Sequence, residues 1–422
     1  MRPSGRVTQV CRTSAERQGA YDLLNSKSFG PGALHAAVVQ STLEQASEGT
    51  LTMIAIDGTS LSLVDRAGEK DFGSIGARSQ GGRGIKFLNA YAMEEDGTPI
   101  GLLRQDWWLR PNEQQDKLPV HERESQEWVD AVNSTSLLLR GWKAPGWYQL
   151  DREGDNGRLL AALAESGQLF TVRSSHGDRR LVGQSTKRLR HLANAAPVSY
   201  RSQVQLPGRP GRRRRTAQVA VRATSVELDL GKLGSLSVNV VDVKEAGRVP
   251  AGEKALHWRL LTNHPVNGPL DAARVIHGYR LRWRVEEFHK TWKSGACAVE
   301  ETQLRSAEAV VKWAIVMAAT ATRIERLKYL HRNEPGLPAT EVLTKWEIMA
   351  AIILRKKYKK RTDPAPKANP TIGEIMSWIA DFGGYTGKSS GGPPGSIVLR
   401  RGMEVMAPLA AGLEQMAEDG QL

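Results

Sequence analysis

The sequence predicts an α/β fold, in which helices flank a mixed β-sheet, a β-rich insertion interrupts the core, and a helical C-terminal region follows. Runs rich in β-branched and apolar residues alternate with helix-length amphipathic runs between residues 51 and 176, which is typical of a mixed core. Residues 206–245 alternate polar and apolar positions, which is the period of a strand. From about residue 300 onward the sequence is mainly helical in character.

The expected elements follow from these runs. Residues 1–17 are polar and are expected to be loose, and residues 23–46 are expected to form a loop and then a helix. The core elements are expected in this order: two strands within 51–65 broken near Gly58, strands at 84–93 and 99–111, a helix at 124–142, a strand at 146–151, a helix at 156–166 and a strand at 168–176. We then expect a strand at 255–266 and one long helix from about 270 to 293, with Asp271 near its start.

Composition limits the classes of protein that fit. The chain has 422 residues and a net charge of +14, which favours a polyanionic partner, nucleic acid before a membrane. Its two cysteines, Cys11 and Cys297, lack the spacing of a metal site, so neither a zinc site nor a disulfide framework is expected. The most apolar segment, 310–322, is too short to span a bilayer, so we expect no membrane partner.

The segment 279–293, "YRLRWRVEEFHKTWK", sorts its residues onto helix faces at about 100° per residue. One stripe is apolar, and the opposite face is polar and carries Tyr279, Arg282, Glu286, Lys290 and Lys293. Glu287 falls to the side of that face. Two interpretations stay open: a solvated face held by i,i+4 ion pairs, or a face on which Glu286 has a chemical role.

Two aspartates supply candidate partners for Glu286. Asp57 in "TMIAIDGTS" and Asp151 in "GWYQLD" each end an apolar, strand-like run. One such aspartate in isolation is more simply a cap on the following turn. Two of them together with Glu286 form a candidate three-carboxylate site, and carboxylate oxygens are the ligands that Mg²⁺ prefers. Two such ions a few ångströms apart can activate a nucleophile and stabilise a leaving oxygen at phosphorus.

These residues also form a signature, Tyr-x2-Arg-x3-Glu-x6-Lys, at Tyr279, Arg282, Glu286 and Lys293. Three other stretches accompany it: "IDGTSLS" (56–62), "GLLRQDWWLRP" (101–111) and "LDREGD" (150–155). With them the chain resembles the bacterial cut-and-paste DDE transposases of insertion-sequence family four, the group of the Tn-five element. The resemblance extends from about residue 17 to residue 392 and is weaker in the β-insertion and in 325–370.

The resemblance implies an RNase H-like catalytic core interrupted by the insertion, with a helical C-terminal region that dimerises. The implied divisions are a short N-terminal segment at 1–22, the first part of the core at 23–175, the insertion at 176–254, the second part of the core at 255–325 and the C-terminal region at 326–422. In that family an N-terminal helical module recognises the transposon ends, and residues 1–22 are too few to form one. Asp22 also stands where a basic, DNA-contacting residue is expected.

The resemblance further implies that Asp57, Asp151 and Glu286 are the catalytic triad and hold two Mg²⁺ ions, with Mn²⁺ as a substitute. The implied reactions are strand nicking, hairpin formation, hairpin resolution and strand transfer at transposon ends. The implied partners are double-stranded DNA, both transposon ends and target, and a second copy of the chain in a synaptic homodimer. The implied location is the bacterial cytoplasm, in association with the nucleoid.

The resemblance also implies further DNA-contacting residues. Tyr279, Arg282 and Lys293 match positions that grip phosphates near the cleaved end, and all three are phosphate donors. Trp258 matches a tryptophan that stacks on a flipped base, the alternative being a strand-core aromatic. Arg173 matches a DNA-contacting position, the alternative being a structural arginine. The basic runs 212–215 and 356–361 are candidates for nonspecific phosphate contacts or for solvated loops.

Two other functions stay open beside transposition. The chain could be a catalytically silent regulator that binds DNA or a transposase protomer. It could also be an RNase H-like nuclease that performs no strand transfer.

Overall fold

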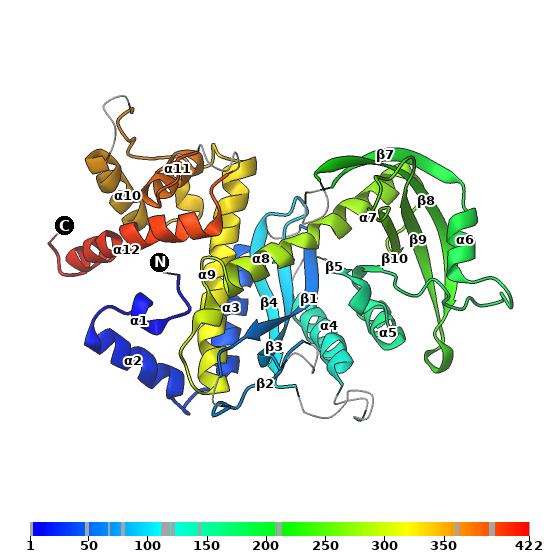
Figure 1. The fold of residues 1–422 in the computed structure, drawn as a ribbon, viewed down its shortest axis with the longest axis horizontal. Helices are drawn as coiled ribbons and strands as arrows, with labels where there is room; N and C mark the ends of the chain where they lie inside the picture. The colour runs from blue at the N-terminus through cyan, green and yellow to red at the C-terminus, as the bar shows by residue number, and fades with distance from the viewer. Residues whose placement is uncertain are drawn as a thin grey trace.

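The structure of the protein is a computed structural model, and it describes most of the chain. The described residues are 3–421, without 47–49, 66–67, 77–80, 111–118, 120–122, 142–144, 207, 209–212, 359–362 and 388–392. The described strands form one ten-stranded mixed sheet in the order β2-β3-β1-β5-β6-β10-β9-β8-β7, with β4 paired to β3. Helices cover this sheet and continue into a helical C-terminal region (Figure 1). The α/β prediction is confirmed.

The first half of the sheet is built from strands that the sequence predicted. Its elements are β1 (Thr52–Ser62), β2 (Gly73–Ser74), β3 (Arg83–Met93), β4 (Pro99–Trp108), β5 (Gly146–Leu150) and β6 (Leu169–Arg173). Strand β1 pairs antiparallel with β3 and parallel with β5, and β5 pairs parallel with β6. The crossovers use α4 (Glu124–Arg140) and α5 (Gly157–Glu165). Asp57, within β1, and Asp151, directly after β5, therefore belong to neighbouring parallel strands.

The predicted break of the first strand near Gly58 is wrong. Strand β1 is continuous from Thr52 to Ser62, and Gly58 pairs with Leu88 of β3 within the ladder. A glycine does not end a strand when its neighbours on both sides remain paired. The consequence is that Asp57 lies inside a paired strand and not in a loop.

The prediction of a loose N-terminal segment is also wrong for the described residues. Helices α1 (Val7–Val10) and α2 (Ser14–Asn25) form there, and α3 (Pro31–Gln45) follows. Thr13 and Glu16 make a reciprocal capping box at the start of α2, a signal that the sequence carries as Thr-x-x-Glu. Gly5 packs so closely that a Cβ there would lie 2.0 Å from the backbone oxygen of Ala298.

The β-rich insertion extends the core sheet. Strands β7 (Val198–Leu206), β8 (Arg215–Asp229) and β9 (Ser235–Glu245) form an antiparallel meander, preceded by α6 (Leu189–Ala195). Strand β10 (His257–Thr262) pairs with β9 on one side and with β6 on the other. These strands lie at the end of the molecule opposite the C-terminal helices (Figure 1).

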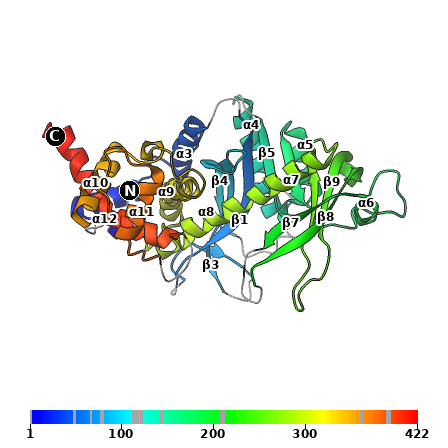
Figure 2. The ribbon, with the colours of Figure 1, turned by 90° about the horizontal axis from the view of Figure 1, so that it is seen from above.

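One long helix was predicted to end near residue 293, and two consecutive helices form instead. Helix α7 (Pro269–Leu281) is followed by α8 (Trp283–Lys293), with Arg282 as the junction residue between them. Figure 2 shows α7 and α8 running end to end across the sheet towards α9 (Ala307–Asn333). The C-terminal helices are α10 (Lys345–Tyr358), α11 (Ile372–Phe382) and α12 (Ser396–Glu418).

The sheet separates two apolar clusters, and the alternation of strand residues decides which side chains meet α8. Met53 and Ala55 of β1 join the cluster that contains Phe288 and Trp292 of α8. Ile54 and Ile56 join the cluster on the opposite face. Asp57 follows Ala55 by two positions and therefore lies on the α8 side. Among the described helices, none is both long enough and apolar enough to cross a bilayer.

Candidate active site

Asp57 and Asp151 each directly follow the last residue at which β1 and β5 pair with each other. Ile56 of β1 is paired with Leu150 of β5 in a parallel register, and each aspartate is the next residue in its chain segment. Asp57 is 7% exposed, and it is the only one of the two that is buried. Asp151 caps the turn Arg152–Gly154, because its Oδ1 accepts a hydrogen bond of 2.8 Å from the backbone N–H of Glu153. The capping interpretation of Asp151 therefore describes a real contact.

Arg282 connects Asp57 with Glu286 of α8. Its Nη1 lies 3.6 Å from Oδ1 of Asp57, and its Nη2 lies 3.4 Å from Oε1 of Glu286. The arginine is 8% exposed, and its buried Nη1 has no hydrogen-bond partner among the described atoms. The guanidinium thus supplies positive charge where the two carboxylates approach each other.

The ionisation of Asp57 reflects its burial first and its charged neighbours second. Burial raises the pKa of Asp57 to about 8; Arg282 acts against this rise, while Glu286, Asp151 and Glu153 add to it. Burial lowers the pKa of Arg282, but the surrounding charges, first of all that of Asp57, raise it by more. Glu153 is a fourth carboxylate that the sequence interpretation missed, and burial followed by Asp151 raises its pKa. One guanidinium does not balance the negative charge of these groups.

Lys293 and Glu287 lie in different surroundings on α8. Nζ of Lys293 donates a hydrogen bond of 3.2 Å to Oγ1 of Thr59 and lies 3.7 Å from Oε1 of Glu300. The lysine therefore contacts β1 two residues beyond Asp57. Glu287 is instead ion-paired with Arg284 at 2.7 Å, as its position at the side of the helical arc suggested. Lys290 is exposed.

Tyr279, Trp258 and Arg173 gather where β6, β10 and α7 meet. The rings of Trp258 and Tyr279 contact edge to face, with centroids 5.6 Å apart. Arg173 is opposite Leu260 in the β6–β10 ladder, and its Nη2 donates a hydrogen bond of 3.0 Å to the backbone oxygen of His257. Tyr279 is buried and Trp258 is half-buried. The structure thus brings these three predicted DNA-contacting residues to one end of α7.

Sequence interpretation missed His289 and Asn89 as well. His289 is buried on α8, and its Nδ1 lies 3.8 Å from Oδ2 of Asp57. Nε2 of the same ring lies 3.0 Å from Nδ2 of Asn89. Burial, followed by Lys293 and Arg282, lowers the pKa of His289 to about 3, so the ring is neutral. The sequence did hold one signal, since Asn89 interrupts the apolar strand "GIKFLNAYAM".

Two known protein families match the chain, and together their matches cover residues 155–417. The transposase DDE domain matches residues 155–322, and the transposase Tn5 dimerisation domain matches residues 319–417. The two matches are consecutive and share only residues 319–322. The chain belongs to the DDE transposases. The predicted resemblance is therefore confirmed, and with it the description of the chain as a DNA transposase that carries a dimerisation domain.

The matched range contains Glu286, Arg282, Tyr279 and Lys293 of the transposase, whereas Asp57 and Asp151 precede it. The assignment of the two aspartates as catalytic consequently rests on their place in the fold. It stays a prediction.

DDE transposases generally use divalent metal ions, so the question is whether the carboxylates of this transposase could hold such ions. The donor chemistry fits, because Asp57, Asp151 and Glu286 offer hard oxygen ligands, and burial together with the neighbouring acids raises the pKa of Asp57 in spite of Arg282. Across the described residues, no group of three His, Cys, Asp or Glu side chains is close enough together to hold an ion as it stands. Arg282 lies between two of the carboxylates and supplies part of the missing charge.

The basic runs of the transposase differ in their surroundings. Arg212 and residues 359–361 lie outside the described residues. Arg215 is ion-paired with Glu245 and, at 2.7 Å, with Glu253, so its guanidinium is engaged within the insertion. Lys356 and Lys357 are exposed in the last turn of α10 and can reach a polyanion.

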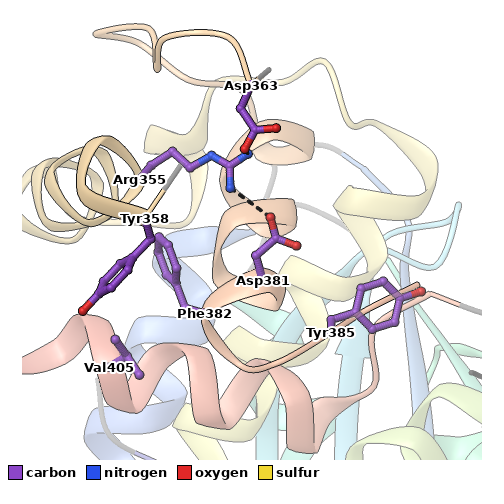
Figure 3. Close-up of a pocket in the computed structure, with 7 residues that line it drawn as sticks. All are labelled: Arg355, Tyr358, Asp363, Asp381, Phe382, Tyr385 and Val405. Atoms are coloured by element: carbon purple, nitrogen blue, oxygen red, sulfur yellow. Dashed lines mark hydrogen bonds and ion pairs between the residues drawn. The ribbon is translucent and has the colours of Figure 1, made fainter. Parts of the chain in front are cut away.

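A cavity of about 490 Å³ lies within the dimerisation domain of the transposase (Figure 3). Arg355 of α10 crosses it and is ion-paired with Asp363 at 2.9 Å and with Asp381 at 3.0 Å. Phe382 and Val405 line its apolar side. The pair with Asp381 joins α10 to α11, so this cavity is an element of the helical packing, and none of the predicted site residues lines it.

Proposed function

We propose that this chain is a metal-dependent transposase that cuts and rejoins DNA at the ends of a mobile element by a cut-and-paste route. The steps are nicking of one strand, hairpin formation, hairpin opening and transfer of the freed end to target DNA. Asp57, Asp151 and Glu286 would hold the divalent cations, Mg²⁺ or its substitute Mn²⁺. Bound there, two such ions activate the attacking oxygen and stabilise the leaving oxygen in an in-line displacement at phosphorus.

One observation carries the proposal: the two aspartates directly follow Ile56 and Leu150, the last paired residues of the adjacent parallel strands β1 and β5, and Arg282 links the buried aspartate to Glu286. Burial and the neighbouring acids disfavour the charged form of Asp57, which supports a cation at this point. Arg282 has an unsatisfied Nη1 and can donate to a phosphate oxygen once a cation neutralises the carboxylates. Lys293, next to Thr59, can donate to the same phosphate group from the other end of α8.

Trp258 and Tyr279 have a separate proposed task, which is to receive a base that leaves the stack during hairpin formation. Trp258 is half-buried, and Tyr279 supports one edge of its ring. Stacking on an aromatic ring contributes roughly 1–3 kcal/mol per base, which offsets much of the cost of unstacking. Arg173, at the same end of α7, can bind the neighbouring backbone.

The proposed organisation follows the predicted divisions, with a core at 23–175 and 255–325, an insertion at 176–254 and a dimerisation region at 326–422. We propose that two copies join through that region on paired transposon ends. The helices α10, α11 and α12 lie at the opposite end of the molecule from the insertion (Figure 1).

The test compares DNA cleavage by three proteins: wild type, Glu286→Gln and the matched control Glu287→Gln. Each is incubated with DNA that carries the ends of its own element, in Mg²⁺. We expect Glu286→Gln to lose cleavage by at least about 100-fold, equivalent to about 2.7 kcal/mol, while DNA binding and Glu287→Gln activity persist. Equal cleavage by Glu286→Gln and wild type would contradict the proposal.

The products of the same assay separate the alternative functions. A regulator would bind the ends, suppress an active relative in mixed reactions and cut nothing by itself. A nuclease without strand transfer would give nicks but neither hairpins nor joined products.

A further inference from the structure

Polar side chains form a row across three adjacent strands beneath α8. Asp57 of β1 is opposite Asn89 of β3, and Asn89 is opposite Gln105 of β4. Residues that are directly opposite each other share a face of the sheet. Asn89 lies between Phe87 and Tyr91, both of which pack against α8, so this face is the α8 side. All three polar residues are buried, and buried polar groups require partners.

His289 of α8 completes this row. Nε2 of Gln105 donates a hydrogen bond of 2.8 Å to Oδ1 of Asn89, which directs the Asn89 amino group towards His289. Nδ2 of Asn89 then donates to Nε2 of His289 at 3.0 Å. A neutral imidazole has one N–H, and a nitrogen that accepts a hydrogen bond cannot carry it. The hydrogen of His289 is therefore on Nδ1, the nitrogen that faces Oδ2 of Asp57.

The surroundings hold this arrangement in place. Phe288 stacks on Tyr91 with ring centroids 4.9 Å apart, and Trp292 packs against the edge of Phe87 at 5.1 Å. These two contacts fix α8 over β3 on both sides of the His289–Asn89 hydrogen bond. Nδ1 of His289 lies 3.8 Å from Asp57, so a shift of roughly 1 Å brings the pair within hydrogen-bond distance.

We propose that His289 is a positioning residue for Asp57: its Nδ1–H, oriented by Asn89 and Gln105, holds Oδ2 and leaves Oδ1 free for a divalent cation. The inference rests on the proposed function of Asp57 as a metal ligand. Hydrogen bonds to a ligating carboxylate fix its orientation, and their loss typically lowers metal affinity by about 10- to 100-fold. Oδ1 is the oxygen nearest Arg282, and the same guanidinium is ion-paired with Glu286.

The first measurement is the tautomer of His289 in the full-length, metal-free protein. Nitrogen-15 NMR of histidine-labelled protein distinguishes the two ring nitrogens, and the signal is assigned by its loss in His289→Asn. We expect the hydrogen on Nδ1. A hydrogen on Nε2 would overturn the proposal, because Nδ1 would then have no N–H to offer Asp57. This result does not depend on catalytic activity.

The second measurement is Mn²⁺ binding to the full chain, followed by electron paramagnetic resonance. An asparagine amide reaches the position of Nδ1, whereas a glutamine amide reaches that of Nε2. We expect His289→Gln to weaken Mn²⁺ binding by about 10- to 100-fold, and His289→Asn to retain affinity within a few-fold. His277→Gln is the control, since His277 contacts the backbone oxygen of Glu95 and is exposed.

The outcomes separate this inference from the proposed function. Equal weakening in His289→Asn and His289→Gln, or no weakening in either, would contradict a positioning role for Nδ1. If Glu286→Gln also leaves Mn²⁺ binding unchanged, the metal site itself is misplaced, and the proposed function fails with it. Melting temperatures of both histidine variants identify any loss of affinity that comes from unfolding.

Discussion

The Arg282 guanidinium lies 3.6 Å from the carboxylate of Asp57, and both side chains are buried. Two unit charges about 4 Å apart attract by about 4 kcal/mol at an effective dielectric constant near 20. Burial and the neighbouring acids outweigh that attraction, because the pKa of Asp57 is still raised to about 8. Arg282 is therefore a partial counter-charge at a position where a divalent cation would be a stronger one.

Replacing Arg282 by Gln tests this relationship. The variant removes the positive charge between Asp57 and Glu286, so we expect the metal-free protein to lose about 1–3 kcal/mol of stability. We also expect Mg²⁺ to raise the melting temperature of Arg282→Gln by more than that of wild type, since the ion no longer competes with the guanidinium. Arg284→Gln, which breaks the pair with Glu287, is the control. An identical response of Arg282→Gln and wild type to Mg²⁺ would show that Arg282 does not compete with the ion.

Trp258→Ala tests the proposed base-stacking task. Removing the ring that Tyr279 supports should weaken hairpin formation by roughly 1–3 kcal/mol, about 5- to 150-fold, and leave the first nick largely intact. Trp258→Phe keeps an aromatic face and should recover most of the hairpin yield. Gel analysis of nicks and hairpins over time makes the measurement. Equal losses at both steps would point instead to an aromatic that only packs against Tyr279.

His35 gives the protein a predicted pH dependence of stability. Its Nε2 accepts a hydrogen bond of 3.0 Å from the backbone N–H of Gln105, and burial followed by Arg104 lowers its pKa to about 4. The folded state therefore binds fewer protons than the unfolded state between about pH 6.5 and pH 4. The contribution is complete above pH 6.5 and is lost as the pH falls through that window, amounting to at most about 3 kcal/mol.

His35→Gln is the variant that checks this dependence, because a glutamine oxygen can accept the same hydrogen bond without titrating. Urea unfolding at several pH values should show a shallower loss of stability below pH 6.5 than in wild type. Some loss should remain, since the pKa of His289 is lowered in the same direction. Parallel curves for the two proteins would mean that His35 does not titrate in this window.

Two glycines of α12 make a matched pair for the dimerisation domain. A Cβ on Gly402 would lie 1.8 Å from the backbone oxygen of Ile379 in α11, whereas a Cβ on Gly412 meets nothing within 4 Å. We expect Gly402→Ala to separate α11 from α12, cost about 1–3 kcal/mol and weaken dimerisation. Gly412→Ala should stabilise the helix by up to about 1 kcal/mol. Thermal unfolding and sedimentation measure both effects, and equal behaviour of the two variants would contradict this packing.

Sequence patterns predicted most strands because their alternation is local, and the helical arc correctly set Glu286 apart from Glu287. They could not predict which side chains of the sheet lie against the polar face of residues 279–293. Tyr279 and Arg282 were assigned to a polar face, yet both are buried, because Tyr279 of α7 packs against Trp258 and Arg282 faces Asp57 of the sheet. His289 was missed for the same reason, since its partners come from strands about 200 residues away. Which side chains meet there depends on strand register, which no local pattern contains.

The way in which the insertion joins the core sheet was also beyond what local sequence patterns predict. Residues 206–245 were correctly predicted to be rich in strands, but the pairing of β9 with β10 and of β10 with β6 joins them to the core sheet. That connection places Trp258 next to Tyr279. A local alternation of polar and apolar residues predicts strands and does not predict which edge they extend.

The central claim is that Asp57, Asp151 and Glu286 bind the divalent cation that DNA cleavage requires, and Asp151→Cys tests it most directly. Asp151 also caps a turn, so loss of activity alone would not separate the two roles. Mg²⁺ binds a sulfur ligand poorly, whereas Mn²⁺, a first-row transition metal, accepts one more readily. We predict that Asp151→Cys cleaves transposon-end DNA in Mn²⁺ but not in Mg²⁺, while wild type cleaves in both. Equal loss of cleavage in both metals, with the fold intact, would contradict a metal-ligand role for Asp151.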